Sequence, residues 1–117
     1  MSQIAISVHF GVTAQSKLTL LERYIDAALA NNHQISCIFL YQDGVYHASQ
    51  ELVLASDELQ STALWQRLAN EAIPLLLCVT AAEKRGVNTE NTAPFTVAGL
   101  AEFAMISSKS DKWVQFK

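Results

Sequence analysis

The segment Pro74-Leu75-Leu76-Leu77-Cys78-Val79-Thr80-Ala81-Ala82-Glu83-Lys84-Arg85-Gly86 determines the expected fold. Its first part opens with a proline, which strands tolerate at their first position, and continues as an apolar run over 75–79. Such runs are typical of strands that are covered on both faces, as in parallel sheets. Its second part has the pattern of a short helix, because Thr80 and Glu83 have the spacing of a capping box and Gly86 follows two basic residues. The segment therefore predicts a buried strand that leads into a helix.

Strand and helix patterns alternate over the rest of the chain. The other expected strands are 4–10, 35–41 and 113–116, the other expected helices are about 17–31, 59–72 and 97–107, and the expected loops are 49–57 and 88–94. Hydrophobic strands that alternate with amphipathic helices indicate a parallel sheet with helices on both faces. We therefore expect one α/β domain over residues 1–117, in three layers α/β/α around a mainly parallel sheet.

The composition restricts the classes of function. The 117 residues are 50% hydrophobic and 16% charged, whereas a typical soluble domain has about 25% charged residues. This composition supplies a full core, and the scarcity of charge indicates that part of the surface is buried in an oligomer. The net charge is −3, so the chain lacks the basic surface of a nucleic-acid binder and has no polybasic patch for a membrane. No signal-peptide pattern and no apolar run of about 18 residues is present, so we expect a cytoplasmic chain without a membrane partner.

Motifs for several common chemistries are missing from the sequence. There is no GxGxxG, no GxxxxGK[ST] and no GxSxG, and the three histidines lack the spacing of metal ligands. We therefore expect no cofactor and no metal. The two cysteines form no CxxC pair, which is consistent with reduced thiols in a cytosolic chain.

Cys78 is the candidate reactive residue because of its expected place in the fold. Ligands of open α/β sheets bind beyond the carboxyl ends of the strands, and Cys78 is next to last in the strand expected over 75–79. A helix that starts at Thr80 would favour a thiolate through its first N–H groups, and Lys84 and Arg85 would add positive charge. The alternative is that Cys78 is a small hydrophobic residue of the core.

The other cysteine, two histidines and the two tryptophans also have expected places in the fold. Cys37 lies in the middle of the run 35–41 and is expected in the core. His47 follows the carboxyl end of that run, so it could line the same crevice as Cys78, although a surface loop is the commoner place for such a residue. His9 is expected to have no role in the site, and Trp65 and Trp113 are expected to pack in the core or against another subunit.

The chain resembles the DsrE-like sulfur-relay family in several stretches. The segment Cys78–Val87 is similar to the family's active-cysteine segment, and 39–48 resembles its aromatic strand followed by a Gly-Val turn. Residues 95–100 and 111–116 resemble the approach to its last helix and its terminal strand. The resemblance implies a sulfurtransferase in which Cys78 carries sulfur as a persulfide, with Thr80, Arg85 and His47 as possible supporting residues.

The resemblance also implies partners. It implies upstream and downstream sulfur-carrier proteins, a homo- or hetero-oligomer with related DsrE-like subunits, and a place in the 2-thiolation of the tRNA wobble uridine without direct contact to nucleic acid. Three alternatives remain open: a homo-oligomer of general sulfur trafficking or sulfur oxidation, a non-catalytic subunit, and an α/β domain in which Cys78 belongs to the core. A second thiol beside Cys78 would expel the cargo as sulfide, so the expected core position of Cys37 favours a carrier over a thioredoxin-type oxidoreductase.

Overall fold

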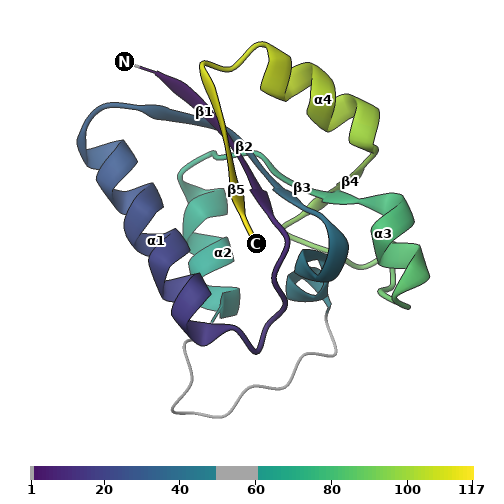
Figure 1. Ribbon diagram of the computed structural model, residues 1–117. Coiled ribbons are helices and arrows are strands. Elements are labelled where there is room, and N and C mark those ends of the chain that lie inside the picture. Colours follow the sequence, from purple (N-terminus) through teal and green to yellow (C-terminus); the bar gives the residue numbers. More distant parts are fainter. Residues whose placement is uncertain (1, 50–60) are drawn as a thin grey trace.

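The computed structural model describes residues 2–49 and 61–117. Its strands form one parallel sheet of five in the order β4-β3-β2-β1-β5 (Figure 1). The strands are β1 (Gln3–Val8), β2 (Gln34–Leu40), β3 (Leu75–Cys78), β4 (Thr96–Ala98) and β5 (Lys112–Phe116). The helices are α1 (Gln15–Ala30), α2 (Ser61–Asn70), α3 (Val79–Lys84), α4 (Leu100–Ser108) and the 3-10 helix η1 (Gln42–Ala48).

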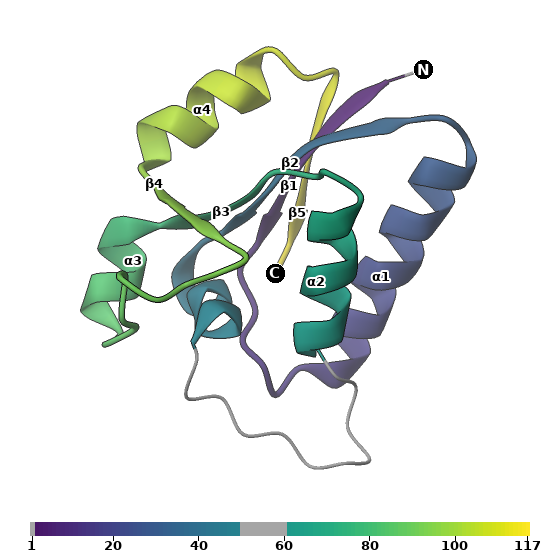
Figure 2. The same cartoon turned by 180° about the vertical axis from the view of Figure 1, so that it is seen from behind.

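The helices cover both faces of the sheet. The steps from β1 to β2 and from β2 to β3 run in the same direction across the sheet, and right-handed crossovers therefore place α1 and α2 on one face. The chain returns from β4 at one edge to β5 at the other, so α4 lies on the opposite face (Figures 1 and 2). This arrangement confirms the predicted α/β fold with a parallel sheet between two helical layers.

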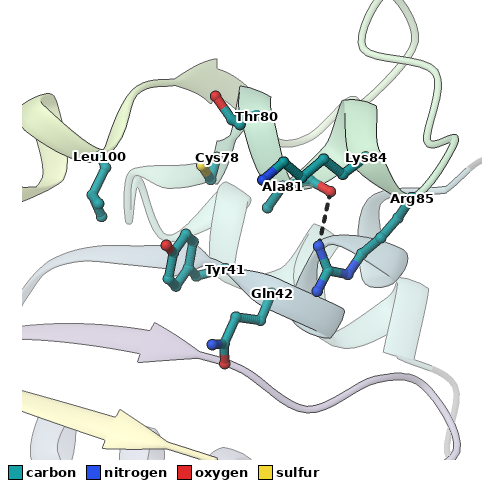
Figure 3. A pocket seen from close by; sticks show the side chains of 8 residues that line it. All are labelled: Tyr41, Gln42, Cys78, Thr80, Ala81, Lys84, Arg85 and Leu100. Carbon is teal, nitrogen blue, oxygen red and sulfur yellow. Dashed lines mark hydrogen bonds between the residues drawn. The ribbon is translucent and has the colours of Figure 1, made fainter.

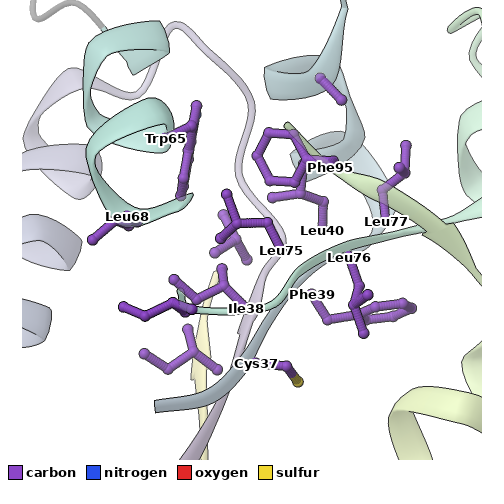
Figure 4. Close-up of a cluster of buried hydrophobic side chains, with 14 of the residues drawn as sticks. Cys37, Ile38, Phe39, Leu40, Trp65, Leu68, Leu75, Leu76, Leu77 and Phe95 are labelled. Atoms are coloured by element: carbon purple, nitrogen blue, oxygen red, sulfur yellow. The ribbon is translucent and has the colours of Figure 1, made fainter. Parts of the chain in front are cut away.

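The core has a layer on each side of the central strands (Figure 4). Ile38 and Leu75 point toward α2, whereas Cys37, Phe39 and Leu76 point toward α4. On the α4 side, Phe39 stacks on Phe103 with 4.6 Å between the ring centroids. β2 and β3 are therefore buried on both faces, as their apolar runs predicted, that of β2 being interrupted only at Ser36.

β1 differs from the alternation expected over residues 4–10. Every residue from Ile4 to Val8 is buried, and the strand ends at Val8 rather than at Phe10. Ser7 is only 1% exposed, and its Oγ accepts a hydrogen bond of 2.9 Å from the indole N–H of Trp113 on β5. β1 lies between β2 and β5, so its polar positions are covered by neighbours that a local pattern cannot reveal.

Two short elements were not predicted. Residues 96–98 form β4, where the sequence predicted a helix from about residue 97, and α4 begins at Leu100 with Gly99 in extended conformation as its N-cap. After β2 the chain enters η1, within which Gly44 packs directly on the backbone of Val8. Of the loop expected over 49–57, only Ser49 lies within the described residues.

Within the described residues, no helix combines the length and the apolar character needed to cross a membrane.

Candidate functional site

Cys78 ends β3 at the carboxyl edge of the sheet, beside Ala98 of β4. It is also the N-cap of α3, because the strand runs into the helix without a loop and Cys78 keeps an extended backbone with φ −72° and ψ 119°. The prediction that Thr80 is the N-cap is therefore wrong: Thr80 lies inside the first turn of α3. In the described part of the chain, no side-chain hydrogen bond caps this helix.

A cavity of about 380 Å³ gives access to Cys78 (Figure 3). Its lining comes from β3, α3 and the start of α4, together with the two residues that follow β2: Tyr41, Gln42, Cys78, Thr80, Ala81, Lys84, Arg85 and Leu100. The cysteine is only 3% exposed, so its thiol is shielded from bulk solvent, and it lies at the wall of this cavity.

The two cations of α3 have different roles. Figure 3 shows the Lys84 side chain lying along α3 with its ammonium group toward Cys78. Arg85 turns instead toward η1, where its Nε donates to Asp43 Oδ1 at 2.9 Å, and its Nη1 donates to Ala81 O at 3.2 Å. Within the described residues Lys84 has no ion-pair partner. Lys84 is therefore the cation of this cavity without an ion pair in the described part of the chain, and Arg85 connects α3 to η1.

His47 does not belong to this cavity. It is 3% exposed, its Nε2 donates to the carbonyl oxygen of Phe10 at 3.1 Å, and its ring packs edge-on against Phe10 and Trp65. The described residues that line the cavity do not include it. Both interpretations of His47, as a crevice residue and as a surface loop residue, are wrong, because η1 turns this residue into the core.

Burial lowers the pKa of His47 from 6.5 to about 4, although its backbone hydrogen bond to Phe10 opposes the shift. The folded protein thus holds this ring neutral, while the unfolded chain takes up a proton near pH 6.5. We expect the free energy of unfolding to be unaffected by His47 above pH 6.5 and to fall by about 3 kcal/mol between pH 6.5 and pH 4. Denaturant titrations across this range measure the slope. His47→Gln should remove that part of it, and an unchanged slope would contradict the assignment.

Cys37 lies in the core, as predicted. It is fully buried in β2, and burial raises the pKa of its thiol from 9.0 to about 11. At neutral pH this sulfur is therefore a protonated thiol, which is a poor nucleophile. Both cysteines are free and buried, but Cys78 lines the cavity, whereas Cys37 is absent from its described lining.

A second cavity, of about 330 Å³, adjoins the first and was not predicted. The two share the lining residues Tyr41, Gln42 and Leu100. Beyond these, the second cavity is lined by Ser7, His9, Phe39, Phe103, Trp113, Gln115 and Lys117. The position of Tyr41 and Gln42 directly after a buried strand was the available signal for their role, since the neighbouring strand carries Cys78.

No metal centre is found in the part of the chain that the structure describes, since it contains no group of three His, Cys, Asp or Glu side chains that could hold an ion. Cys78 is a shielded thiol, and Lys84 lines the same cavity.

Comparisons with known proteins relate the whole chain to one family. The model of the DsrE/DsrF-like family matches residues 5–116. A sulfurtransferase TusD homolog of Pasteurella multocida is 40% identical over 99 residues, which cover 75% of this chain and 79% of the relative. The sulfurtransferase TusD of Klebsiella pneumoniae strain 342 is 35% identical over 107 residues, which cover 80% of this chain and 84% of the relative.

Solved structures share the fold at lower identity. The YchN protein of E. coli superposes with a TM-score of 0.84 at 20% identity, covering 99% of this chain and 100% of the other. MTH1491 of Methanobacterium thermoautotrophicum superposes with a TM-score of 0.75 at 11% identity, covering 98% of this chain and 99% of the other. At these identities the likeness concerns the fold alone.

Proposed function

The chain belongs to the DsrE/DsrF-like family, and from this premise we propose that it is a sulfurtransferase that carries sulfur as a persulfide on Cys78. Membership confirms the resemblance found in the sequence, and the TusD relatives are named sulfurtransferases. The observation that carries the proposal is the position of Cys78 at the end of β3, at the start of α3 and within a cavity that also holds Lys84.

The reaction consists of two exchanges at sulfur. The Cys78 thiolate attacks the outer sulfur of a donor persulfide, so that a new sulfur–sulfur bond forms and the donor leaves as a thiolate. A thiolate of the acceptor then attacks the outer sulfur on Cys78, which leaves as a thiolate in its turn. Neither step needs an oxidant or a reductant, because each breaks one sulfur–sulfur bond and forms another. The rates depend on the thiolate fraction and on access to the sulfur.

The surroundings of Cys78 suit this chemistry. The ammonium group of Lys84 and the first N–H groups of α3 favour negative charge on the sulfur, both in the free thiolate and in the persulfide. The other cysteine, Cys37, is buried and protonated, so it cannot attack the persulfide and release sulfide. These features support a carrier rather than a thiol–disulfide oxidoreductase.

The partners are proposed by similarity to the TusD relatives. Upstream and downstream sulfur-carrier proteins supply and receive the sulfur, related DsrE-like subunits assemble with the chain, and the pathway is 2-thiolation of the tRNA wobble uridine. Leu100, Met105 and Trp113 are each about half exposed on the α4 side of the sheet, which supports assembly with another subunit.

Incubation with a persulfide donor should add one sulfur atom to the intact mass, and a reducing thiol should remove it. A mass that stays unchanged would contradict the proposed function.

Lys84 provides a test of the electrostatic part of the proposal. In Lys84→Gln the cavity loses its unpaired cation, so we expect the rate of Cys78 alkylation by iodoacetamide at neutral pH to fall about fivefold at low salt. The difference should shrink as salt screens the charge. Lys109→Gln, at the far end of α4, is the matched control and should leave the rate unchanged. Equal effects of the two variants would show that Lys84 does not act on the thiol.

A further inference from the structure

His9 contacts two of the residues that line the cavity of Cys78. Its Nδ1 lies 3.0 Å from Gln42 Oε1, and its ring packs edge-on against Tyr41 with 5.7 Å between the centroids. On its other side, Nε2 lies 2.9 Å from Ser7 Oγ. His9 follows β1 and the two cavity residues follow β2, so this contact joins adjacent strands at the carboxyl edge of the sheet.

The partners determine the direction of each hydrogen bond around His9. Gln42 Oε1 can only accept, so Nδ1 of His9 carries the hydrogen. In the neutral ring Nε2 is then an acceptor, and it receives the hydroxyl hydrogen of Ser7. Ser7 Oγ itself accepts from the indole N–H of Trp113 at 2.9 Å. A directed chain of hydrogen bonds therefore runs from β5 through Ser7 and His9 to the wall between the two cavities.

Gln42 needs such a restraint. It is an exposed residue that lines both cavities, and an exposed glutamine without a partner samples several rotamers. Its backbone has a φ of 50°, in the left-handed region that side chains other than glycine rarely adopt. Figure 3 shows its amide directed away from Cys78, on the side of β1. The bond from His9 holds the amide in this direction.

We propose that His9 is a positioning residue for sulfur transfer at Cys78, because it holds Gln42 out of the cavity that the incoming sulfur-bearing group must enter. The sulfur-bearing identity of that group rests on the proposed function, whereas the effect on access to the thiol does not. His9 touches neither Cys78 nor the reacting sulfur, so it acts through Gln42 and Tyr41.

Three substitutions at His9 separate positioning from general packing. His9→Ala should lower the rate of Cys78 alkylation by iodoacetamide about fivefold, because Gln42 is released. His9→Asn should restore most of the rate, since its side-chain amide N–H can replace Nδ1–H toward Gln42. His9→Gln extends its amide toward Ser7 instead and should stay slow. Equal rates in all three variants, or a wild-type rate in His9→Ala, would overturn the proposal.

A double variant tests whether Gln42 is the obstructing group. In His9→Ala/Gln42→Ala the side chain that could enter the cavity is gone, so alkylation should return to the wild-type rate even if the melting temperature stays lowered. A double variant as slow as His9→Ala would overturn the proposal. The same series measured with a persulfide donor keeps the two claims apart. If wild-type protein accepts no sulfur while the alkylation series behaves as expected, the proposed function fails and the positioning role of His9 stands.

Discussion

Cys78→Ser is expected to abolish persulfide loading while leaving the fold intact. Serine is nearly isosteric with cysteine, so the junction between β3 and α3 keeps its packing, but a hydroxyl is a far weaker nucleophile at neutral pH. Intact-mass spectra after incubation with a persulfide donor should show no added sulfur. Thermal unfolding of the same sample should show a melting temperature close to that of the wild type.

Cys37→Ala is the matched control and should behave in the opposite way. It removes a small, fully buried group from β2, so the free energy of unfolding should fall by about 1 kcal/mol. Loading at Cys78 should continue, because Cys37 lies outside the described lining of the cavity. If Cys78→Ser still takes up sulfur, or if Cys37→Ala does not, then Cys78 is not the thiol that carries the sulfur.

Gly44→Ala is expected to destabilise the protein strongly. A Cβ at this position would collide with the carbonyl group of Val8 at the end of β1, and backbone atoms of a central strand cannot move aside as a flexible side chain can. We expect a loss of about 3 kcal/mol or more in the free energy of unfolding. Because η1 would be pushed away from β1, the ion pair of Asp43 with Arg85 should weaken, and alkylation of Cys78 should change as well.

Gly99→Ala is the control for Gly44→Ala. Nothing lies within 4 Å of a Cβ added at Gly99, and its backbone is extended. Denaturant titrations should therefore give a change of less than about 1 kcal/mol. If both glycine variants are equally stable, the close contact between η1 and β1 does not contribute to stability as described.

The parallel sheet could be predicted from local sequence because its central strands are unusual in composition. The apolar runs in β2 and β3 extend over both faces, which a half-exposed strand does not show. β4 could not be predicted in this way, since its three residues are too few for a periodic pattern. The N-cap of α3 was misplaced by two residues, at Thr80 instead of Cys78, because a capping box is a local signal, whereas the backbone of Cys78 is fixed by the sheet.

The place of Cys78 could also be predicted, because the apolar run over 75–79 indicated a buried strand that ends beside it, and the carboxyl end of a buried parallel strand is a general place for function. The residues that surround Cys78 and the adjoining cavity could not be predicted. His9, Gln42 and Leu100 come together from three distant parts of the chain, and no spacing between them indicates contact. His47 was misplaced for the reverse reason: it follows the strand closely in sequence, but η1 turns it toward Phe10 and away from the cavity.

The central claim is that Cys78 carries the transferred sulfur, and the most direct test is to locate that sulfur in the wild-type protein. The arrangement of Lys and Arg residues places the two cysteines in separate tryptic peptides, Cys37 in 24–67 and Cys78 in 68–84. The protein is loaded with a persulfide donor, alkylated, digested and analysed by tandem mass spectrometry. The additional sulfur should be found in peptide 68–84, on Cys78. Sulfur in peptide 24–67, or in neither peptide, would contradict the claim.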